Sequence, residues 1–370
     1  MNRMLNRIAW AQISAIVRIE MRKTFFAKRG LWIYLLALAP VALFLAHSLI
    51  EIHQHGARRQ MALKNTRPLT ENDFLAIGVG MSRGDVIVRL GEPPNYRSRQ
   101  RRVRTGRKSY TIVPSETLRY SNGNDELAIT IENGAVTGVG RISGVSFGQD
   151  SYVFAGVFQF FFIRLAIFFG CLGIFMNLFR GEMLDKSLHF YLLTPVRREI
   201  LMLGKYFAGL LAATVIFSAS TVLQLFALLL QFDASTIGQY LYQNHGIAQM
   251  AAYLGVTVLA CIGYGSIFLA AGLLFRNPIV PAAAVLIWEA ANPVLPALLK
   301  KFSVIYYLKS LCPVEISLDP GMPPLFALLA SNPEPISRYI AIFGLLALSV
   351  LVLLAAAKRV RRLEINYGTD

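Results

Sequence analysis

Long apolar runs recur along this chain and limit what it can fold into. One helical crossing of a hydrocarbon layer about 30 Å thick needs roughly 20 consecutive, predominantly apolar residues. Only 16% of the 370 residues are charged, whereas about a quarter are charged in soluble domains. Six segments have the length and composition of a crossing: 31–50, 153–178, 206–231, 248–275, 279–299 and 337–357. The sequence therefore predicts an α-helical polytopic membrane protein with six transmembrane helices.

The distribution of Lys and Arg predicts how these helices are oriented. If residue 1 is cytoplasmic, the segments on its side carry 17 Lys and Arg, and the short loops on the opposite side carry four. Such an excess marks cytoplasmic loops, and loops longer than about 60 residues are exempt from this rule. The 15 Lys and Arg of 51–150 therefore do not oppose it. We expect both termini in the cytoplasm, with a basic tail at 358–370, and residues 51–150 on the extracytoplasmic side.

The first 30 residues have a different pattern from the spans. Ile13, Ile16 and Ile19 recur at helical spacing, and Arg18 and Arg22 lie on another face. Such a helix lies in the membrane interface with its basic side chains toward lipid headgroups. The sequence predicts an amphipathic cytoplasmic helix within 1–30, followed by a retained signal-anchor helix at 31–50. An ordinary juxtamembrane helix without a mechanical role remains the alternative.

Residues 51–150 have the composition of a small water-soluble domain. Asn-Gly pairs at 122–123 and 133–134 predict tight turns between short strands. The spacing of Val86 and Leu90 before a Gly/Pro stop predicts a helix over 83–90. We expect an extracytoplasmic α+β domain inserted between the first and second transmembrane helices.

A basic run, RSRQRRVRTGRK, occupies 97–108 and has seven Lys and Arg among its twelve residues. We expect a solvated loop between a helix and a strand. The alternative is contact with anionic headgroups or with a polyanionic envelope polymer. A nucleic-acid partner is not expected, because the run lies on the non-cytoplasmic side of the membrane.

Motifs for catalysis, metal binding or ATP binding are not evident in the sequence. A phosphate-binding loop needs Gly-Lys followed by Ser or Thr, but Tyr206 follows Gly204-Lys205. His53 and His55 alternate without a further ligand nearby in sequence. We therefore expect no enzyme activity, no catalytic residue, no metal and no cofactor in this chain.

Two ionisable residues, Arg164 and Glu289, fall near the middle of predicted spans. Intramembrane charges are costly and normally face a partner or a wet cavity. The two residues are candidates for a charge pair or for a substrate pathway. A purely structural ion pair, or two charges that each face water, are the alternatives.

The fifth apolar stretch, 279–299, is interrupted by prolines. Pro281, Pro293 and Pro296 lie within it, and Pro278 directly precedes it. Proline removes a helical hydrogen bond and kinks or ends a helix. This stretch is therefore predicted as one crossing that could consist of two half-helices with a re-entrant outer part.

The cytoplasmic segment RGEMLDKSLHFYLLTPVRREILMLGKYFAGLL, Arg180 to Leu211, resembles the corresponding segment in permease subunits of type-2 ABC exporters. The family pattern has a Glu after the second span, a Leu-Leu-x-x-Pro step, an Arg, and Gly-Lys at the opening of the third span. Lys186-Ser187 departs from the Gly-Thr that is usual in the family. The residues that the resemblance assigns to ATPase coupling are Glu182, Asp185, Ser187, Leu188, Leu192, Pro195, Arg197, Arg198 and Lys205.

This resemblance, which covers 1–50 and 151–357 with the basic tail, implies an architecture and partners. The family has an N-terminal amphipathic elbow helix, six spans and a cytoplasmic coupling loop, here 180–205. It implies a second copy of the chain in the membrane and a separate ABC ATPase subunit that holds ATP and Mg. The implied location is the bacterial inner membrane. An ordinary charged cytoplasmic loop is the alternative interpretation of 180–205.

The segment LAIGVGMSRGDVIVRLGEPP, Leu75 to Pro94, and the strands after it resemble the SmpA/OmlA (BamE-like) domain of envelope lipoproteins. The matching positions are Gly80, Met81, Ser82, Val86, Leu90, Gly91 and Pro93. The resemblance implies a binding or assembly module for an envelope partner. No lipobox Cys precedes it, so the transmembrane helices would be its anchor.

These observations lead to one expected function and two alternatives. The first is the permease subunit of an ATP-driven exporter, homodimeric in the membrane, that moves an amphipathic or bulky substrate outward. The second is a membrane-anchored sensor or envelope assembly factor whose 51–150 domain binds a protein or polymer. An intramembrane enzyme would need paired catalytic groups at one depth, for which only Arg164 and Glu289 are candidates.

Overall fold

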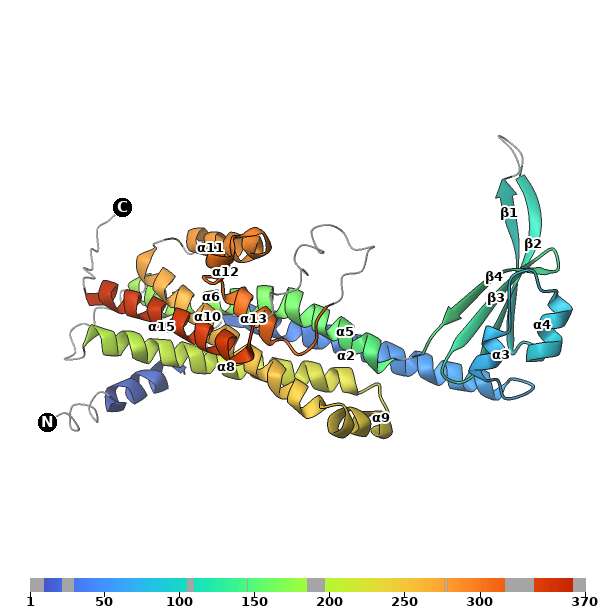
Figure 1. The fold of residues 1–370 in the computed structure, drawn as a ribbon, viewed down its shortest axis with the longest axis horizontal. Helices are drawn as coiled ribbons and strands as arrows, with labels where there is room; N and C mark the ends of the chain where they lie inside the picture. Colours follow the sequence, from blue (N-terminus) through green and yellow to red (C-terminus); the bar gives the residue numbers. More distant parts are fainter. Residues whose placement is uncertain are drawn as a thin grey trace. The chain divides into compact units, whose positions relative to one another are not determined.

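The computed structural model describes residues 10–21, 30–104, 110–144, 146–184, 197–275, 277, 279–316 and 336–361. The chain divides into two compact units. A helical unit contains Met1–Leu45, Ser151–Leu228 and Ala234–Asp370, and a second unit contains Ala46–Asp150 with Leu229–Asp233. The elements of both are drawn in Figure 1.

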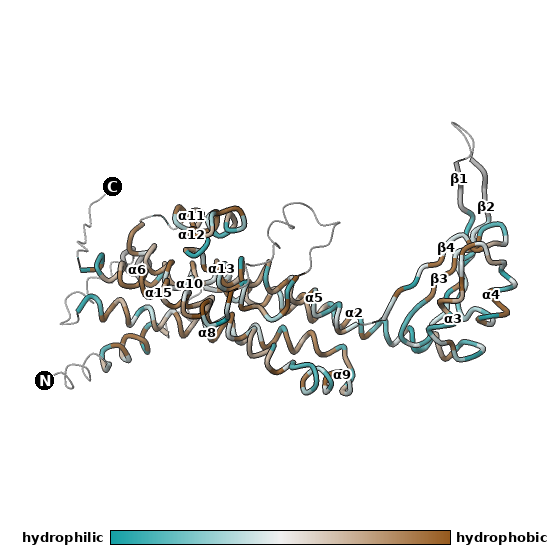
Figure 2. Tube along the Cα trace, in the orientation of Figure 1, coloured by the Kyte–Doolittle hydropathy of each residue, from teal (hydrophilic) through white to brown (hydrophobic). Residues whose placement is uncertain are grey.

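Within the described residues, five helices are long and apolar enough to cross a membrane: Leu31–Leu63, Phe147–Leu178, Arg198–Leu229, Gly246–Leu274 and Arg338–Arg361. They are α2 (Leu31–Leu63), the continuous run of α5 (Phe147–Val157), η2 (Phe158–Ile167) and α6 (Phe168–Leu184), then α8 (Arg198–Leu229), α10 (Gly246–Leu274) and α15 (Arg338–Arg361). Apolar residues predominate along these helices (Figure 2). The fold is therefore that of a multi-pass membrane protein, as the apolar runs predict.

One helix boundary differs from the prediction. The first apolar run ends near residue 50, but α2 continues to Leu63. Residues 51–63 contain polar and charged residues, and the helix continues through them because few of these residues oppose helix formation. The residues from Ala46 onward belong to the second unit.

Buried aromatic side chains form the centre of the helical unit. Phe158 stacks on Phe154 and meets Tyr253 edge-on, with ring centroids 4.8 Å apart in the second pair. The α10 helix comes close to α6 at Gly272, where an added Cβ would lie 3.2 Å from the Met176 backbone. Small residues therefore let these helices approach closely, as expected of membrane helix interfaces.

The helices α10 and α15 run parallel. The start of α10 faces the start of α15 around a shared groove that includes Ala252 and Arg338. Further along both helices, Gly263 approaches Leu345. Parallel helices require the intervening chain to return along their length.

Residues 279–311 of that returning chain form several short elements. These are α11 (Ile279–Ala291), the 3-10 turn η4 (Asn292–Val294), α12 (Ala297–Lys300) and α13 (Val304–Leu311). The 13 residues of α11 extend about 20 Å, which is less than one crossing. The break comes at Pro293 and Pro296, so the interruption predicted from the prolines is present.

The second unit holds a four-stranded antiparallel sheet with strand order β1-β2-β3-β4. Its elements are α3 (Glu71–Leu75), α4 (Arg83–Leu90), β1 (Asn95–Arg104), β2 (Tyr110–Ser121), β3 (Glu126–Glu132) and β4 (Ala135–Ile142). Both predicted Asn-Gly turns connect strands, and Gly123 and Gly134 have positive φ there. Val86 and Leu90 of α4 are fully buried in a separate apolar core.

The α4 helix has the predicted bounds, and its start is explained by its first residues. The side chain of Ser82 accepts a hydrogen bond from the amide of Asp85, and the Asp85 carboxylate accepts from the amide of Ser82. This reciprocal pair is a capping box, which satisfies donors that a helix start leaves open. Ser82 is therefore the N-cap of α4.

The expected loop at 97–108 is wrong for most of its length. Residues 95–104 form β1, which pairs with β2 from Asn95 opposite Arg119 to Arg104 opposite Tyr110. The described side chains Arg97 and Arg99 are exposed. Edge strands often carry charged side chains because these discourage pairing with other chains, so a basic run is compatible with a strand here.

Candidate functional site

A buried ion pair joins the N-terminal helix to α8. The Lys205 Nζ lies 2.8 Å from Glu20 Oε1, and the two side chains are 0% and 4% exposed. The same ammonium donates a hydrogen bond of 2.8 Å to the carbonyl oxygen of Leu178 in α6. Three segments of the chain therefore meet at one buried cation, and we call Glu20, Lys205 and Leu178 the Lys205 clamp.

The residue before Lys205 completes this contact. A Cβ on Gly204 would lie 3.0 Å from the Ile16 side chain, so only glycine lets the N-terminal helix approach this closely. Ile16 and Glu20 are four residues apart and therefore share one helix face. Both are buried, whereas Trp10 is 67% exposed. Residues 10–21 thus form a helix whose buried side is held by Gly204 and Lys205.

The start of α8 also contacts the end of α15. Arg198, the first residue of α8, donates a hydrogen bond of 3.3 Å to the carbonyl oxygen of Arg361. The Arg361 guanidinium pairs with Glu199. Arg197 is exposed directly before α8. The ends of two long helices are therefore joined at the start of α8.

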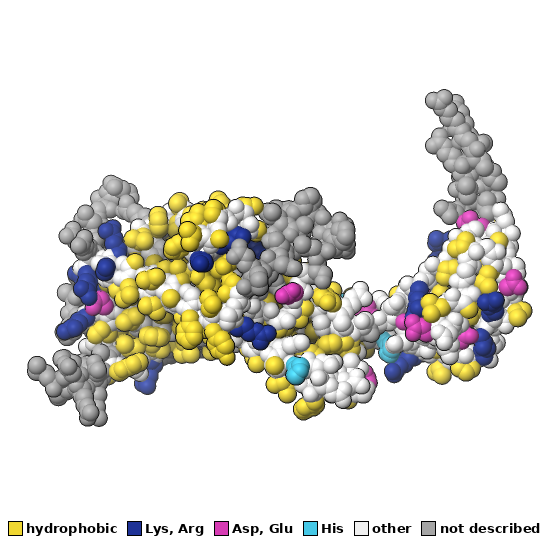
Figure 3. Space-filling model, viewed as in Figure 1, with side chains coloured by type: hydrophobic (Ala, Val, Ile, Leu, Met, Phe, Trp, Pro, Cys, Tyr) yellow, Lys and Arg dark blue, Asp and Glu magenta, His cyan; other side chains and the backbone are white. Residues whose placement is uncertain are grey.

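The same end of the helical unit carries a group of exposed cations. Figure 3 shows Lys and Arg gathered there, and apolar side chains covering the middle of the unit. The exposed basic residues at the start of α8 and the end of α15 are Arg197, Arg198, Lys358, Arg359 and Arg361. This distribution is the one that the positive-inside rule associates with a cytoplasmic face.

The other predicted coupling residues have different placements. Glu182 lies near the end of α6. Asp185, Ser187, Leu188, Leu192 and Pro195 lie outside the described residues. Lys205 is buried inside the chain, and its role there is to hold the N-terminal helix.

Glu289 lies in α11 and caps a helix that is distant in sequence. Its carboxylate accepts hydrogen bonds from the Ser303 hydroxyl and from the amides of Val304 and Ile305, at 2.8, 2.9 and 2.8 Å. These amides begin α13, and the first amides of a helix have no partner within it. A carboxylate is also favoured at this positive end of the helix dipole. Glu289 is therefore a buried cap that joins α11 to α13.

Arg164 lies in the π-helix η2 and is part-buried. Electrostatic interactions connect it to Glu289 and Tyr264, while the hydrogen bonds of Glu289 go to residues 303–305. The structure thus brings the two predicted intramembrane charges into the same region. Short π segments are frequent at functional sites, and the ten residues of η2 make it unusually long.

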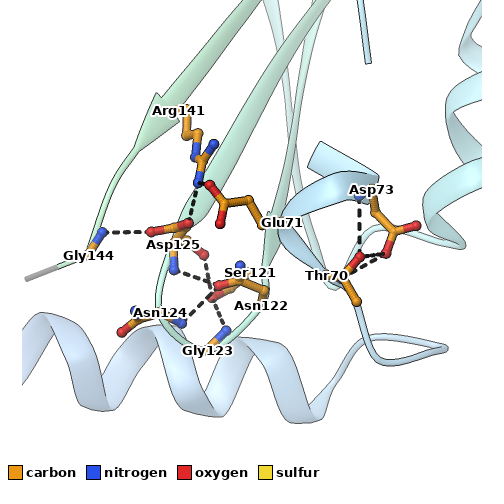
Figure 4. A network of polar contacts seen from close by, with 10 residues as sticks. All are labelled: Thr70, Glu71, Asp73, Ser121, Asn122, Gly123, Asn124, Asp125, Arg141 and Gly144. Atoms are coloured by element: carbon orange, nitrogen blue, oxygen red, sulfur yellow. Dashed lines mark hydrogen bonds and ion pairs between the residues drawn. The ribbon is translucent and has the colours of Figure 1, made fainter. Parts of the chain in front are cut away.

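A polar network joins three segments of the second unit (Figure 4). Arg141 at the end of β4 contacts Glu71 of α3 and Asp125, each at 2.7 Å. Asp125 also accepts a hydrogen bond from the Gly144 amide at 2.8 Å. Burial raises the pKa of Asp125, but the bonds from Gly144 and Arg141 outweigh it and hold that pKa below its ordinary value. The network is a structural lock between α3, the β2–β3 turn and the chain after β4.

Sequence reasoning missed Glu20, although a signal was present. An acidic residue four positions after Ile16 lies on the apolar face of the predicted amphipathic helix, where a charge needs a partner. Among the described residues, no group of three or more His, Cys, Asp or Glu side chains could hold a metal ion. Comparisons with models of protein families, with curated proteins and with solved structures give no match.

Proposed function

We propose that this chain is the membrane-spanning permease subunit of an ATP-driven exporter of the type-2 ABC class. It would form a homodimer and bind a separate ATPase subunit, which holds ATP and Mg. It would move an amphipathic or bulky substrate outward. Support comes from the five long apolar helices and from the family pattern between Arg180 and Leu211.

The observation that carries this proposal is the Lys205 clamp. α6 ends at Leu184 and α8 begins at Arg198, so these two helices flank the proposed coupling loop. A subunit that does not itself hydrolyse ATP needs a rigid connection that transmits movement from that loop to its membrane-spanning helices. The clamp supplies one, because displacement of α8 moves Glu20 and the N-terminal helix with it. In this role the N-terminal helix is the elbow helix of the transporter.

The six crossings of such a permease are compatible with the parallel course of α10 and α15. Two parallel spans in one membrane need a return crossing between them. The segment from α11 to α13 would provide it as interrupted helices, with Glu289 joining two of them. Both termini would then lie on the cytoplasmic side, together with the exposed cations of α8 and α15.

The test is purification of the tagged chain from native membranes in mild detergent, followed by mass spectrometry and an ATPase assay. We expect an ABC ATPase at near one-to-one stoichiometry. Arg197→Glu, at an exposed position beside the loop, should release the ATPase, whereas Lys358→Glu on α15 should retain it. A chain that purifies without any ATPase, and whose conformation does not respond to nucleotide, would contradict the proposal.

A second candidate function is that of a membrane-anchored sensor or assembly factor. It is favoured by one observation: the described residues of the second unit include a separate core of eleven buried residues and an edge strand, β1, on which Arg97 and Arg99 are exposed. Such a unit has the features of an independent binding module. Replacing residues 64–145 by a flexible linker separates the two functions. Loss of envelope partners with ATPase binding intact confines this unit to recognition, whereas full function after disruption of the 180–205 loop favours the sensor.

A further inference from the structure

A groove of about 480 Å³ lies between α10 and α15 in the helical unit. One wall comes from the first turns of α10, and the other from the start of α15 and the end of α13. Its volume is within the range of roughly 300–1,000 Å³ that is typical of small-molecule sites. None of the residues placed in the Lys205 clamp or the Glu289 cap lines this groove.

The wall from α10 is apolar and carries little side-chain bulk. Ala248, Ala252 and Gly255 follow one another at helical spacing and line the groove, and Leu259 extends it. Gly255 has open space around its missing side chain. Opposite them, Ile342 of α15 contributes an apolar side chain. This wall suits an extended hydrocarbon chain lying along the helix.

One end of the groove is polar and basic. Arg338, the exposed first residue of α15, lines it together with His245 and Gln249. The first turn of α15 has no acidic residue, and the described residues provide no carboxylate partner for Arg338. Both helices begin here, so this end lies at the level of the membrane surface. An exposed Arg at that level attracts anionic lipid headgroups.

We infer that the groove binds an anionic phospholipid, with one acyl chain along α10 and the phosphate at Arg338. The inference requires membrane insertion but not coupling to an ATPase. The apolar wall would contact the acyl chain of a lipid, and Arg338, at the end of the groove, would contact its headgroup. A soluble anion would contact only Arg338, and a neutral lipid would contact only the apolar wall.

The test is native mass spectrometry of the full chain, purified in mixed micelles that contain equal amounts of phosphatidylglycerol and phosphatidylcholine. The natural sequence should retain phosphatidylglycerol in preference to phosphatidylcholine. Arg338→Gln removes a charge-assisted contact and should reduce that preference about tenfold. Lys301→Gln, at an exposed basic position outside the groove, should not change it. An unchanged preference in Arg338→Gln overturns the headgroup assignment.

Ala252→Phe tests the acyl-chain wall by filling it. We expect the retained lipid to be lost, while Ala347→Phe, at an exposed position of α15, should keep it. Full lipid retention by Ala252→Phe overturns the inference, as does displacement of the lipid by glycerol 3-phosphate, which carries no acyl chain. The same spectra report subunit number. Conversion of dimers to monomers by Ala252→Phe without a change in lipid would identify the groove as a subunit interface instead.

Discussion

The carboxylate of Glu20 and the ammonium of Lys205 are 185 positions apart in sequence and 2.8 Å apart in the structure. Both are excluded from solvent. Removing one charge of a buried pair is costly because the other charge stays buried without compensation. This relationship makes the N-terminal helix part of the helical unit.

The first prediction concerns the charges of this pair. Lys205→Met should destabilise the protein by about 3–5 kcal/mol, because Glu20 loses its buried partner. The double variant Glu20→Leu with Lys205→Met should recover most of that loss, since apolar replacement of a whole buried pair is often neutral. Thermal unfolding in detergent micelles measures both, with Lys358→Met as an exposed control. Equal destabilisation of single and double variants would contradict the pairing.

The second prediction concerns the close approach at Gly204. Gly204→Val should push the N-terminal helix away, because its Cβ would meet Ile16 at 3.0 Å and the branched side chain needs more room. Limited proteolysis should then cut within residues 10–21 faster than in the natural sequence. Gly156→Val is the matched control, because an added Cβ there has no neighbour within 4 Å. Restored resistance on adding Ile16→Ala would assign the effect to this contact, and no change in proteolysis would exclude it.

The sequence predicts those features that depend on neighbouring residues. Long apolar runs predict the long helices, the Asn-Gly pairs predict the turns of the sheet, and the spacing of Val86 and Leu90 before a Gly/Pro stop predicts α4. Pairing between distant segments was not predictable in this way. The basic residues of β1 form a strand because β2 lies beside them, and their own pattern favours a loop.

The same distinction holds for the candidate site. Arg164 and Glu289 stand out because charges are rare in apolar runs, and Lys205 stands out through the family pattern. The residues that they contact were not predictable, because these contacts depend on how helices far apart in sequence pack together. Arg164 was one candidate partner for Glu289, but the hydrogen bonds of Glu289 go to the start of α13.

The third prediction concerns the cap made by Glu289. Glu289→Ala leaves the Ser303 hydroxyl and two amides without their acceptor, at a cost of about 1–3 kcal/mol for each buried group. Hydrogen exchange at Val304 and Ile305 should therefore accelerate strongly. Arg164→Ala should accelerate it much less, because Arg164 does not bind these amides. Equal acceleration by both substitutions would show that the cap depends on the arginine.

The fourth prediction concerns the acid stability of the second unit. The pKa of Asp125 is lower in the folded protein than its ordinary value, which is about 3.9 in unfolded chains. Its carboxylate therefore contributes stability that is fully present above about pH 4 and is lost as the pH falls through the lower, folded pKa. Hydrogen exchange of the β3 amides in the full chain, corrected for intrinsic rates, should show this loss of protection. Asp125→Asn should reduce protection at neutral pH and flatten its dependence on acid. An unchanged acid dependence in that variant would mean that another carboxylate controls the lock, and Glu71→Gln would then be the substitution that removes it.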